Sequence, residues 1–278
     1  MQKIQPRGDN MYFDYHMHTN FSADCDYTME EMCEAAIGKN LDEIAITDHH
    51  DIDYQDDSIQ FNLDKEGYLK ELERCKEKFA GRLVIKKGIE MGLQPHILKE
   101  SNDFLQDDFD FIICSFHTAE KKDLYNGDFF EGKSQWDAYH KYLESILEVV
   151  QNFDNYSVLG HLDLVRRYDF YDNKPDLMDN DKAVEIIREI LKEVIKKDKG
   201  IEVNTAGYYI EEGNNPNPTV KVLELYKELG GKILTIGSDS HSPEQLAYKF
   251  PETFKMLKKV GFDKLTTFKN MNPRFHKI

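Results

Sequence analysis

Short apolar runs, many of them β-branched, alternate along the whole chain with longer segments of helical periodicity. Short runs with few charges are typical of strands that are buried on both faces of a parallel sheet. We predict strands at Tyr12–Tyr15, Glu43–Thr47, Leu83–Ile89, Phe109–Ser115, Ser157–Leu159, Gly200–Val203 and Lys232–Ile236, and a weaker strand at Lys264–Phe268.

The segments between these runs carry apolar residues at the spacing of an amphipathic helix. Thr28 and Glu31 form a capping-box pattern that opens a helix ending near Gly38. Further helices are predicted at Asp64–Phe79, Ser134–Phe153, Asp181–Lys197, Pro218–Leu229 and Pro251–Val260, with Val184, Ile187, Leu191, Val194 and Ile195 as the apolar face of the fourth of these. The alternation predicts an α/β fold with a parallel sheet. Because no linker or repeat divides the chain, we expect residues 1–278 to form a single domain.

Polar residues capable of chemistry stand at or just after each of the first seven predicted strands. They are His16, His18, Asp48, His49, Glu90, His117, His161, Asn204, Asp239 and His241. In a parallel barrel the carboxyl ends of all strands point to one face, where the loops build the active site. An open sheet would bring together only the residues near its switch point. The pattern therefore favours a closed barrel.

Composition and charge narrow the range of partners. Of the 278 residues, 40% are hydrophobic and 32% charged, which is enough apolar material for a core and excludes a disordered chain. The net charge of −16 argues against nucleic acid or anionic membrane as a partner. The four cysteines form no C-x-x-C pair, residues 1–10 lack an apolar signal segment, and no run is long enough to span a membrane. We expect free thiols and a cytoplasmic location; the sequence does not indicate the oligomeric state.

The His16-Met17-His18 pattern is the sharpest local signal, because residues two apart on a strand point to the same side. One strand-end histidine by itself more often binds a backbone carbonyl. Here six histidines stand with the carboxylates Asp24, Glu90 and Asp239, more ligands than one ion needs. The set predicts two or three metal ions that share a carboxylate, and it contains no cysteine, so a structural Cys-type zinc site is excluded. Asp48 is interpreted as a residue that orients a ligand histidine.

Six ordered motifs resemble those of the polymerase-and-histidinol-phosphatase (PHP) superfamily. The segment Asp14–Asp24 resembles its first motif. The later ones are Thr47-Asp48-His49 (T-D-H), Gly88–Gly92 (G-x-E-x-G), Ser115–His117 (S-x-H), Gly160–Asp163 (G-H-x-D) and Ser238–His241 (S-D-S-H). Together they reach from residue 14 to residue 241, so the resemblance covers nearly the whole chain.

The resemblance implies a distorted seven-stranded (β/α) barrel with a trinuclear metal site at the carboxyl ends of the strands. One metal would bind His16, His18, Glu90 and Asp239; a second would share Glu90 and bind His117 and His161; a third would bind Asp24, His49 and His241. Such ligand sets accept Zn, Mn or Fe.

Within the superfamily, the segments Phe129–Ser134 and His161–Tyr168 resemble the stand-alone histidinol-phosphate phosphatases. That resemblance implies a phosphomonoesterase that hydrolyses L-histidinol phosphate in histidine biosynthesis, by attack of a metal-activated hydroxide. The family's phosphate-binding arginine would be Arg167 or Arg166, and we favour Arg167, with Lys133 as a weaker candidate.

The resemblance also suggests roles at the leaving group. Asp24 and His241 are candidates for protonating the departing alkoxide, beside Glu90 and Arg167 as the other catalytic residues. Phe129, Phe130 and Tyr168 are candidates for packing on the imidazole of the substrate.

Two other functions stay open at this point. One is a related PHP hydrolase acting on a nucleotide monophosphate, a cyclic phosphodiester or a DNA 3′ end, of which the charge disfavours the last. The other is a non-enzymatic, metal-stabilised binding module.

Overall fold

A computed structural model describes residues 11–55, 58–106, 109–168, 170–210 and 215–278. Across these residues a parallel sheet has the strand order β1-β2-β4-β5-β8-β9-β10. Its strands are β1 (Phe13–Asp14), β2 (Glu43–Ile46), β4 (Val84–Gly92), β5 (Phe111–Ser115), β8 (Val158–Leu159), β9 (Gly200–Asn204) and β10 (Leu234–Gly237). They occur at the seven predicted positions, with ends that differ from the predicted ends by at most three residues.

The two outer strands of this sheet, β1 and β10, meet and close it. The amide of Tyr15 donates to the carbonyl of Ile236 at 3.0 Å, and the amide of His18 donates to the carbonyl of Ser240 at 2.9 Å. A parallel bridge joins Met17 to Ser240 beyond the ends of both strands. The predicted α/β barrel of seven parallel strands is therefore confirmed.

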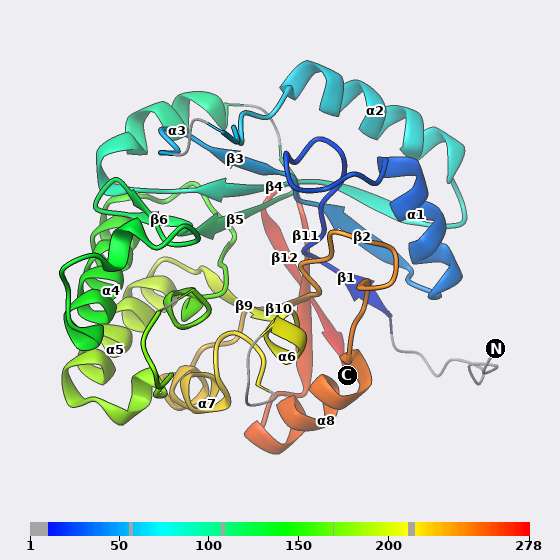
Figure 1. Ribbon diagram of the computed structural model, residues 1–278. Coiled ribbons are helices and arrows are strands. Elements are labelled where there is room, and N and C mark those ends of the chain that lie inside the picture. The colour runs from blue at the N-terminus through cyan, green and yellow to red at the C-terminus, as the bar shows by residue number, and fades with distance from the viewer. Residues whose placement is uncertain (1–10, 56–57, 107–108, 169, 211–214) are drawn as a thin grey trace.

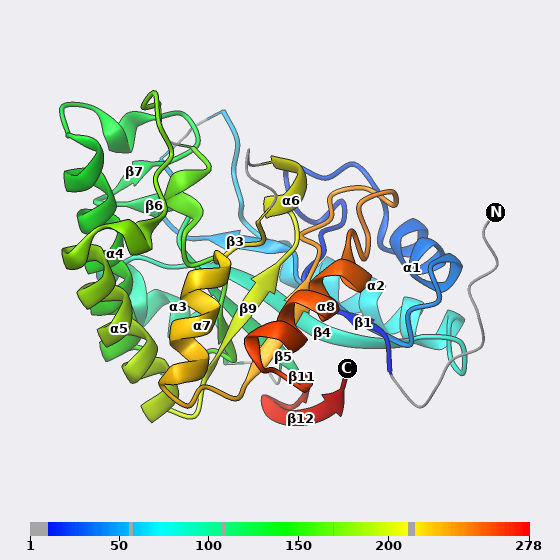
Figure 2. The same ribbon diagram turned by 90° about the horizontal axis from the view of Figure 1, so that it is seen from below.

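Helices cover the outside of the barrel, as Figure 1 shows from one end and Figure 2 from the side. They are α1 (Met29–Gly38), α2 (Lys65–Lys78), α3 (Leu98–Phe104), α4 (Gln135–Asn152), α5 (Asp181–Lys196), α6 (Gly207–Ile210), α7 (Val220–Glu228) and α8 (Phe250–Val260). The predicted capping box opens α1, where Thr28 and Glu31 bond to each other's backbone amides. Among the described residues, none of the helices has both the length and the apolar character needed to cross a bilayer.

Packing of helices on the strands forms the core. Every residue of β2 and of β5 is buried, as expected for strands covered on both faces. The inner face of α5 lies slightly to one side of the predicted one, because Val184 and Ile195 are only half-buried. Its buried residues are Ala183, Ile186, Ile187, Ile190, Leu191 and Val194.

Several short elements escaped prediction. Strand β3 (His49–Asp51) pairs with the carboxyl-terminal part of β4, and β6 (Thr118–Ala119) forms a hairpin with β7 (Lys122–Asp123). The predicted weaker strand exists as β11 (Lys264–Lys269), but it pairs antiparallel with β12 (Asn272–Lys277), outside the barrel sheet. This hairpin lies at the amino-terminal ends of the strands, where the Tyr15 hydroxyl accepts the Phe268 amide at 2.9 Å.

Candidate metal centre and its pocket

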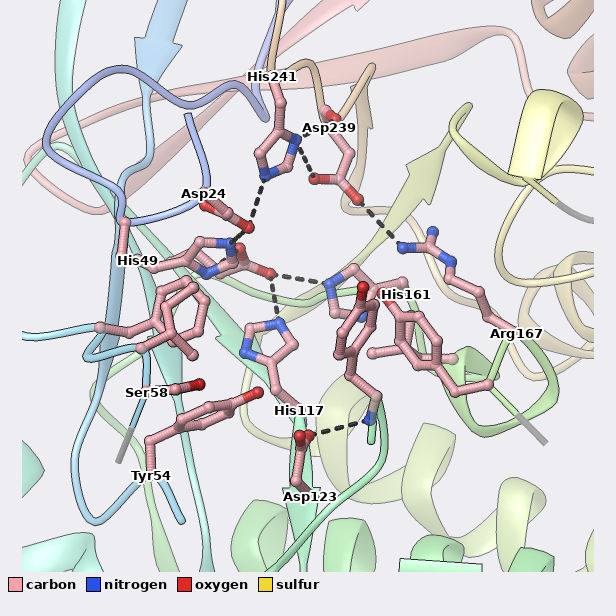
Figure 3. Close-up of a pocket in the computed structure, with 17 residues that line it drawn as sticks. Asp24, His49, Tyr54, Ser58, His117, Asp123, His161, Arg167, Asp239 and His241 are labelled. Carbon is pink, nitrogen blue, oxygen red and sulfur yellow. Dashed lines mark hydrogen bonds and ion pairs between the residues drawn. The ribbon is translucent and has the colours of Figure 1, made fainter. Parts of the chain in front are cut away.

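The predicted metal ligands gather at the carboxyl ends of the strands (Figure 3). Four of them form the tightest group. Nε2 of His16 lies 3.1 Å from Oε2 of Glu90 and 3.5 Å from Oδ1 of Asp239, and Nε2 of His18 lies 3.5 and 3.2 Å from the same two oxygens. Four donor atoms from three strand ends thus face one point.

A second group surrounds the other oxygen of Glu90. Oε1 lies 2.8 Å from Nε2 of His161 and 3.3 Å from Nε2 of His117, and it accepts a hydrogen bond of 2.7 Å from the hydroxyl of Ser115. The two oxygens of Glu90 therefore face two different groups of histidines, which is the arrangement of a bridging carboxylate.

The third group lies nearer to solvent and is looser. Oδ2 of Asp24 lies 3.2 Å from Nε2 of His241 and 3.7 Å from Nε2 of His49. The Asp24 and His241 side chains are 35% and 27% exposed, in contrast to the fully buried Glu90. Nδ1 of His49 also lies 3.0 Å from Oε2 of Glu90, so this histidine faces both groups.

These groups fit divalent metal ions. Four buried atoms at the centre have no hydrogen-bond partner among the described residues, namely His16 Nε2, His18 Nε2, His49 Nδ1 and Glu90 Oε2. A buried polar atom without a partner is costly, and here four converge. Ligands bound tetrahedrally at about 2.0–2.2 Å lie roughly 3.3 Å apart, close to the distances between these donors. Nitrogen and carboxylate oxygen are the ligands that Zn, Mn and Fe accept.

The electrostatics keep the carboxylates ionised. Burial raises the pKa of Glu90, but three neighbouring imidazoles outweigh it and hold that pKa well below its ordinary value. The imidazoles belong to His16, His49 and His117. Burial likewise raises the pKa of Asp239, and again nearby histidines hold it well below the usual range. Both groups are therefore anionic and ready to bind a cation.

Burial lowers the pKa of His18 and His49 at the centre, whereas nearby carboxylates raise it. Burial, together with the charges of His241 and His49, lowers the pKa of His18 to about 3, so its ring is neutral and can serve as a ligand. Burial also lowers the pKa of His49, but the carboxylates of Glu90 and Asp24 raise it to about 9. A cation is thus favoured where His49 meets the two carboxylates.

Buried polar residues that the sequence did not single out fix the rings. Nδ1 of His16 donates to Oε1 of Glu202 at 2.6 Å, and Nδ1 of His117 donates to Oδ2 of Asp51 at 2.6 Å. Because the carboxylate holds the proton on each Nδ1, Nε2 is the nitrogen that would bind a metal ion, in place of the proton that it carries without one. Two signals were available: Glu202 is a charged residue inside an otherwise apolar strand, and Asp51 follows His49 by two residues.

Asp48 is linked to the His18 ring through the side chain of Ser22. Its carboxylate accepts a hydrogen bond of 2.8 Å from the Ser22 hydroxyl, and also binds the backbone amide of Thr19 at 2.6 Å. The Ser22 oxygen in turn accepts from Nδ1 of His18 at 3.1 Å and from the His49 amide at 3.0 Å. The structure thus supports an orienting role for Asp48, one residue removed from the ring.

The turn after β10 places Asp239 by an unusual backbone. Asp239 has a left-handed φ of 53°, and its amide donates to the His16 carbonyl at 2.8 Å. A Cβ at Gly237 would lie 2.3 Å from Cβ of His16, so only glycine lets the two strand ends approach this closely. Oδ2 of Asp239 then faces the amide nitrogen of Asn204 at 3.1 Å and Nη1 of Arg167 at 3.7 Å.

A pocket of about 600 Å³ opens onto the three groups of ligands (Figure 3). Arg167 reaches into it with a side chain that is only 6% exposed. Aromatic residues and one further acidic residue form much of the remaining wall. They include Tyr54, Phe61, Asp123, Tyr125 and Tyr168.

Other residues predicted to bind the substrate point elsewhere. Nε of Arg166 donates to the Pro175 carbonyl at 3.0 Å, and Nζ of Lys133 donates to the Phe129 carbonyl at 2.6 Å. Neither side chain is among the described lining residues of the pocket. Phe129 and Phe130 are also absent from that lining, because both are buried in the hydrophobic core. Of the predicted substrate contacts, the structure brings Arg167 and Tyr168 to the metal ligands.

Comparison with known proteins gives one consistent result. Residues 14–206 match the PHP domain family. The chain is 35% identical to histidinol-phosphatase of Lactococcus lactis over 93% of its own length and 94% of that protein, and 32% identical to a probable histidinol-phosphatase of Clostridium acetobutylicum over 91% and 98%. It superposes with a TM-score of 0.86, at 33% identity, on a crystal structure of the Lactococcus lactis histidinol phosphate phosphatase complexed with zinc, L-histidinol and phosphate, covering 95% of this chain and 98% of that one.

Proposed function

This chain belongs to the PHP domain family, and we propose that it is a metal-dependent phosphomonoesterase that hydrolyses L-histidinol phosphate to L-histidinol and phosphate in histidine biosynthesis. The observation that carries the proposal is the convergence of nine candidate metal-ligand side chains at the carboxyl ends of the strands, where seven of them and the buried Arg167 line one pocket. The likeness to histidinol-phosphatase over 93% of the chain supports the choice of substrate.

We propose that two to three divalent ions bind, two of them on either side of Glu90 and the third beside Asp24. The first site would use His16, His18, Glu90 and Asp239; the second Glu90, His117 and His161; the third Asp24, His49 and His241. Bound divalent ions lower the pKa of water to near neutrality and offset negative charge on phosphoryl oxygens. Zn, Mn and Fe all suit these ligands, and the zinc in the Lactococcus lactis structure supports the first of them.

Arg167 would hold the phosphate. Its guanidinium is buried at the pocket wall, 3.7 Å from Asp239, and its planar donors match two phosphoryl oxygens at once. A phosphate beside Asp239 and the metal ligands thus lies within reach of Arg167. In that position the arginine stabilises the charge that develops on the phosphoryl oxygens during the reaction.

The pair of Asp24 and His241 would handle the leaving group. Nε2 of His241 and Oδ2 of Asp24 are 3.2 Å apart, and this pair is the most exposed part of the centre. Burial lowers the pKa of His241, but hydrogen bonding and charge from Asp24 and Asp239 raise it above its ordinary value. With the third ion bound, that ion would offset the charge on the departing alcohol oxygen; the pair would supply a proton to this oxygen only where no third ion binds.

We also propose that the protein is cytoplasmic. All four cysteines are free and buried, which suits a reducing compartment.

The test is a comparison of kcat/KM after defined metal loading, with release of inorganic phosphate as the readout. The substrates are L-histidinol phosphate, phosphoserine, a nucleoside monophosphate and a cyclic phosphodiester. We expect the highest value for L-histidinol phosphate. An equal or higher value for one of the other three would defeat the proposed substrate and leave a metal-dependent phosphoesterase. Absence of turnover with all four substrates, and with an aryl phosphate tested beside them, would favour a metal-stabilised binding module.

A further inference from the structure

Asp123 is a buried carboxylate in the wall of the pocket, with 1% of its surface exposed. Its Oδ1 accepts the Tyr125 amide at 2.9 Å, and its Oδ2 accepts the Asn126 amide at 3.2 Å. Among the described residues these neutral donors are its hydrogen-bond partners, and no basic side chain forms an ion pair with it. Carboxylates are rarely so buried without a cation. A ligand in the pocket is the natural source of that cation.

The hairpin of β6 and β7 holds Asp123 close to the metal ligands. Asp123 pairs across the hairpin with Thr118, the residue after His117, and the Leu124 amide donates to the His117 carbonyl at 3.2 Å. The Cα atoms of paired residues in such a hairpin lie about 4.5–5.5 Å apart. The carboxylate therefore lies a short, fixed distance from one side of the metal centre.

Figure 3 shows Asp123 on the same side of the pocket as Tyr54 and His117, across from Asp239 and His241. Aromatic rings also line the pocket. Tyr54 and Phe61 have ring centroids 5.0 Å from each other, and Tyr125 packs edge-on against Tyr168 at 5.6 Å. Faces of aromatic rings attract organic cations, so the rings and the carboxylate favour the same kind of ligand group.

We propose that Asp123 binds the positively charged group of the leaving alcohol and so selects phosphomonoesters of cationic alcohols. The proposal builds on the phosphatase function proposed above. The phosphate would lie against the metal ligands and Arg167, and the ammonium or protonated imidazole of the alcohol against Asp123. The same carboxylate would repel an alcohol that carries a negative charge, which gives selection by rejection as well as by attraction.

Asp123→Asn removes the charge and keeps one of the two oxygens that accept backbone amides in this turn, so the comparison between substrates separates lost charge from a disturbed turn. The variant and the wild-type protein, both loaded with metal, are compared on L-histidinol phosphate, glycerol 3-phosphate and 3-phosphoglycerate, whose alcohols are cationic, neutral and anionic. Asp128→Asn is the matched control, since Asp128 is an exposed carboxylate in the same loop that does not line the pocket.

We expect kcat/KM for L-histidinol phosphate to fall at least about tenfold relative to glycerol 3-phosphate, through KM, as for the loss of one charge-assisted hydrogen bond. The value for 3-phosphoglycerate should rise relative to glycerol 3-phosphate. Asp128→Asn should change neither ratio. Equal losses on all three substrates would show that Asp123 only supports the loop, and would overturn the proposal, as would unchanged ratios.

A binding measurement separates this proposal from the proposed function. L-histidinol alone is titrated into wild-type and Asp123→Asn protein by calorimetry, which requires no turnover. Weaker binding to the variant supports Asp123 as the cation site even if the wild-type enzyme prefers another phosphomonoester. Equal binding, or no binding to either protein, overturns it, whatever the enzyme hydrolyses.

Discussion

Glu202 and His16 form a buried pair in which Oε1 of the carboxylate lies 2.6 Å from Nδ1 of the ring. The other oxygen of Glu202 accepts the His161 amide at 3.1 Å. One side chain on β9 therefore fixes a ring that follows β1 and the backbone that follows β8. We therefore expect the affinity of the two proposed metal sites that share Glu90 to depend on Glu202, although Glu202 would contact neither ion.

Glu202→Gln should weaken metal binding by roughly 10- to 100-fold, the usual effect of losing a partner behind a ligand histidine. The amide retains the size of the side chain but has one acceptor oxygen instead of two. Competition with a chromogenic chelator measures the affinity. Wild-type affinity in a folded variant would show that the His16 ring is held by packing alone.

Glu90→Gln should abolish activity and reduce the metal content, since the bridging carboxylate loses its charge and one oxygen ligand. The barrel should stay folded, because residues at the carboxyl ends of barrel strands serve chemistry more than stability. Circular dichroism, elemental analysis and turnover report these three properties. Glu100→Gln, an exposed position in α3, is the control. Normal turnover with full metal occupancy would contradict the role of Glu90.

Arg167→Ala should raise KM for phosphomonoesters and lower kcat/KM by about 2–3 kcal/mol, roughly 30- to 150-fold, as expected for charge-assisted bonds to phosphate. Arg166→Ala is an informative neighbour, because Arg166 binds the Pro175 carbonyl and faces Asp163 at 3.6 Å. It should lower thermal stability and leave KM nearly unchanged. The reverse result would move the phosphate contact to Arg166.

Chelation should remove two to three ions per chain and lower the melting temperature, because ions that bind only the folded state stabilise it. Elemental analysis before and after reconstitution gives the number, and calorimetry gives the shift. A constant value of zero or one ion after reconstitution would contradict the proposed ligand sets.

The sequence was most informative where chemistry follows a strand directly. His16, His18 and Glu90 could be placed because a buried strand that ends in a potential ligand can be recognised from the sequence alone. The contacts of Glu202 and Asp51 could not, since they depend on which strand ends become neighbours. Arg166 and Arg167 show a second limit: they are adjacent at the end of a 3₁₀ turn over Leu164–Arg166, and only the local backbone decides which one enters the pocket.

Loops were the least predictable parts. Phe129 and Phe130 are aromatic, as a substrate contact would be, yet both are buried in the hydrophobic core. Asp123 went unnoticed because its hairpin is built from two-residue strands, too short for any periodicity. The assignment of residues 1–278 to one domain stays a prediction, as does the binding of ions at the three sets of ligands.

The closure of the barrel between β1 and β10 also has a consequence for the synthesis of the protein chain itself. His16 and His18 leave the ribosome more than two hundred residues before Asp239 and His241. Because the bridge from Met17 to Ser240 brings these ends together, the first metal site cannot exist on a nascent chain that stops short of Asp239. Loading of this site with metal would therefore follow the synthesis of Asp239, and a chain terminated before that residue would lack the complete set of ligands.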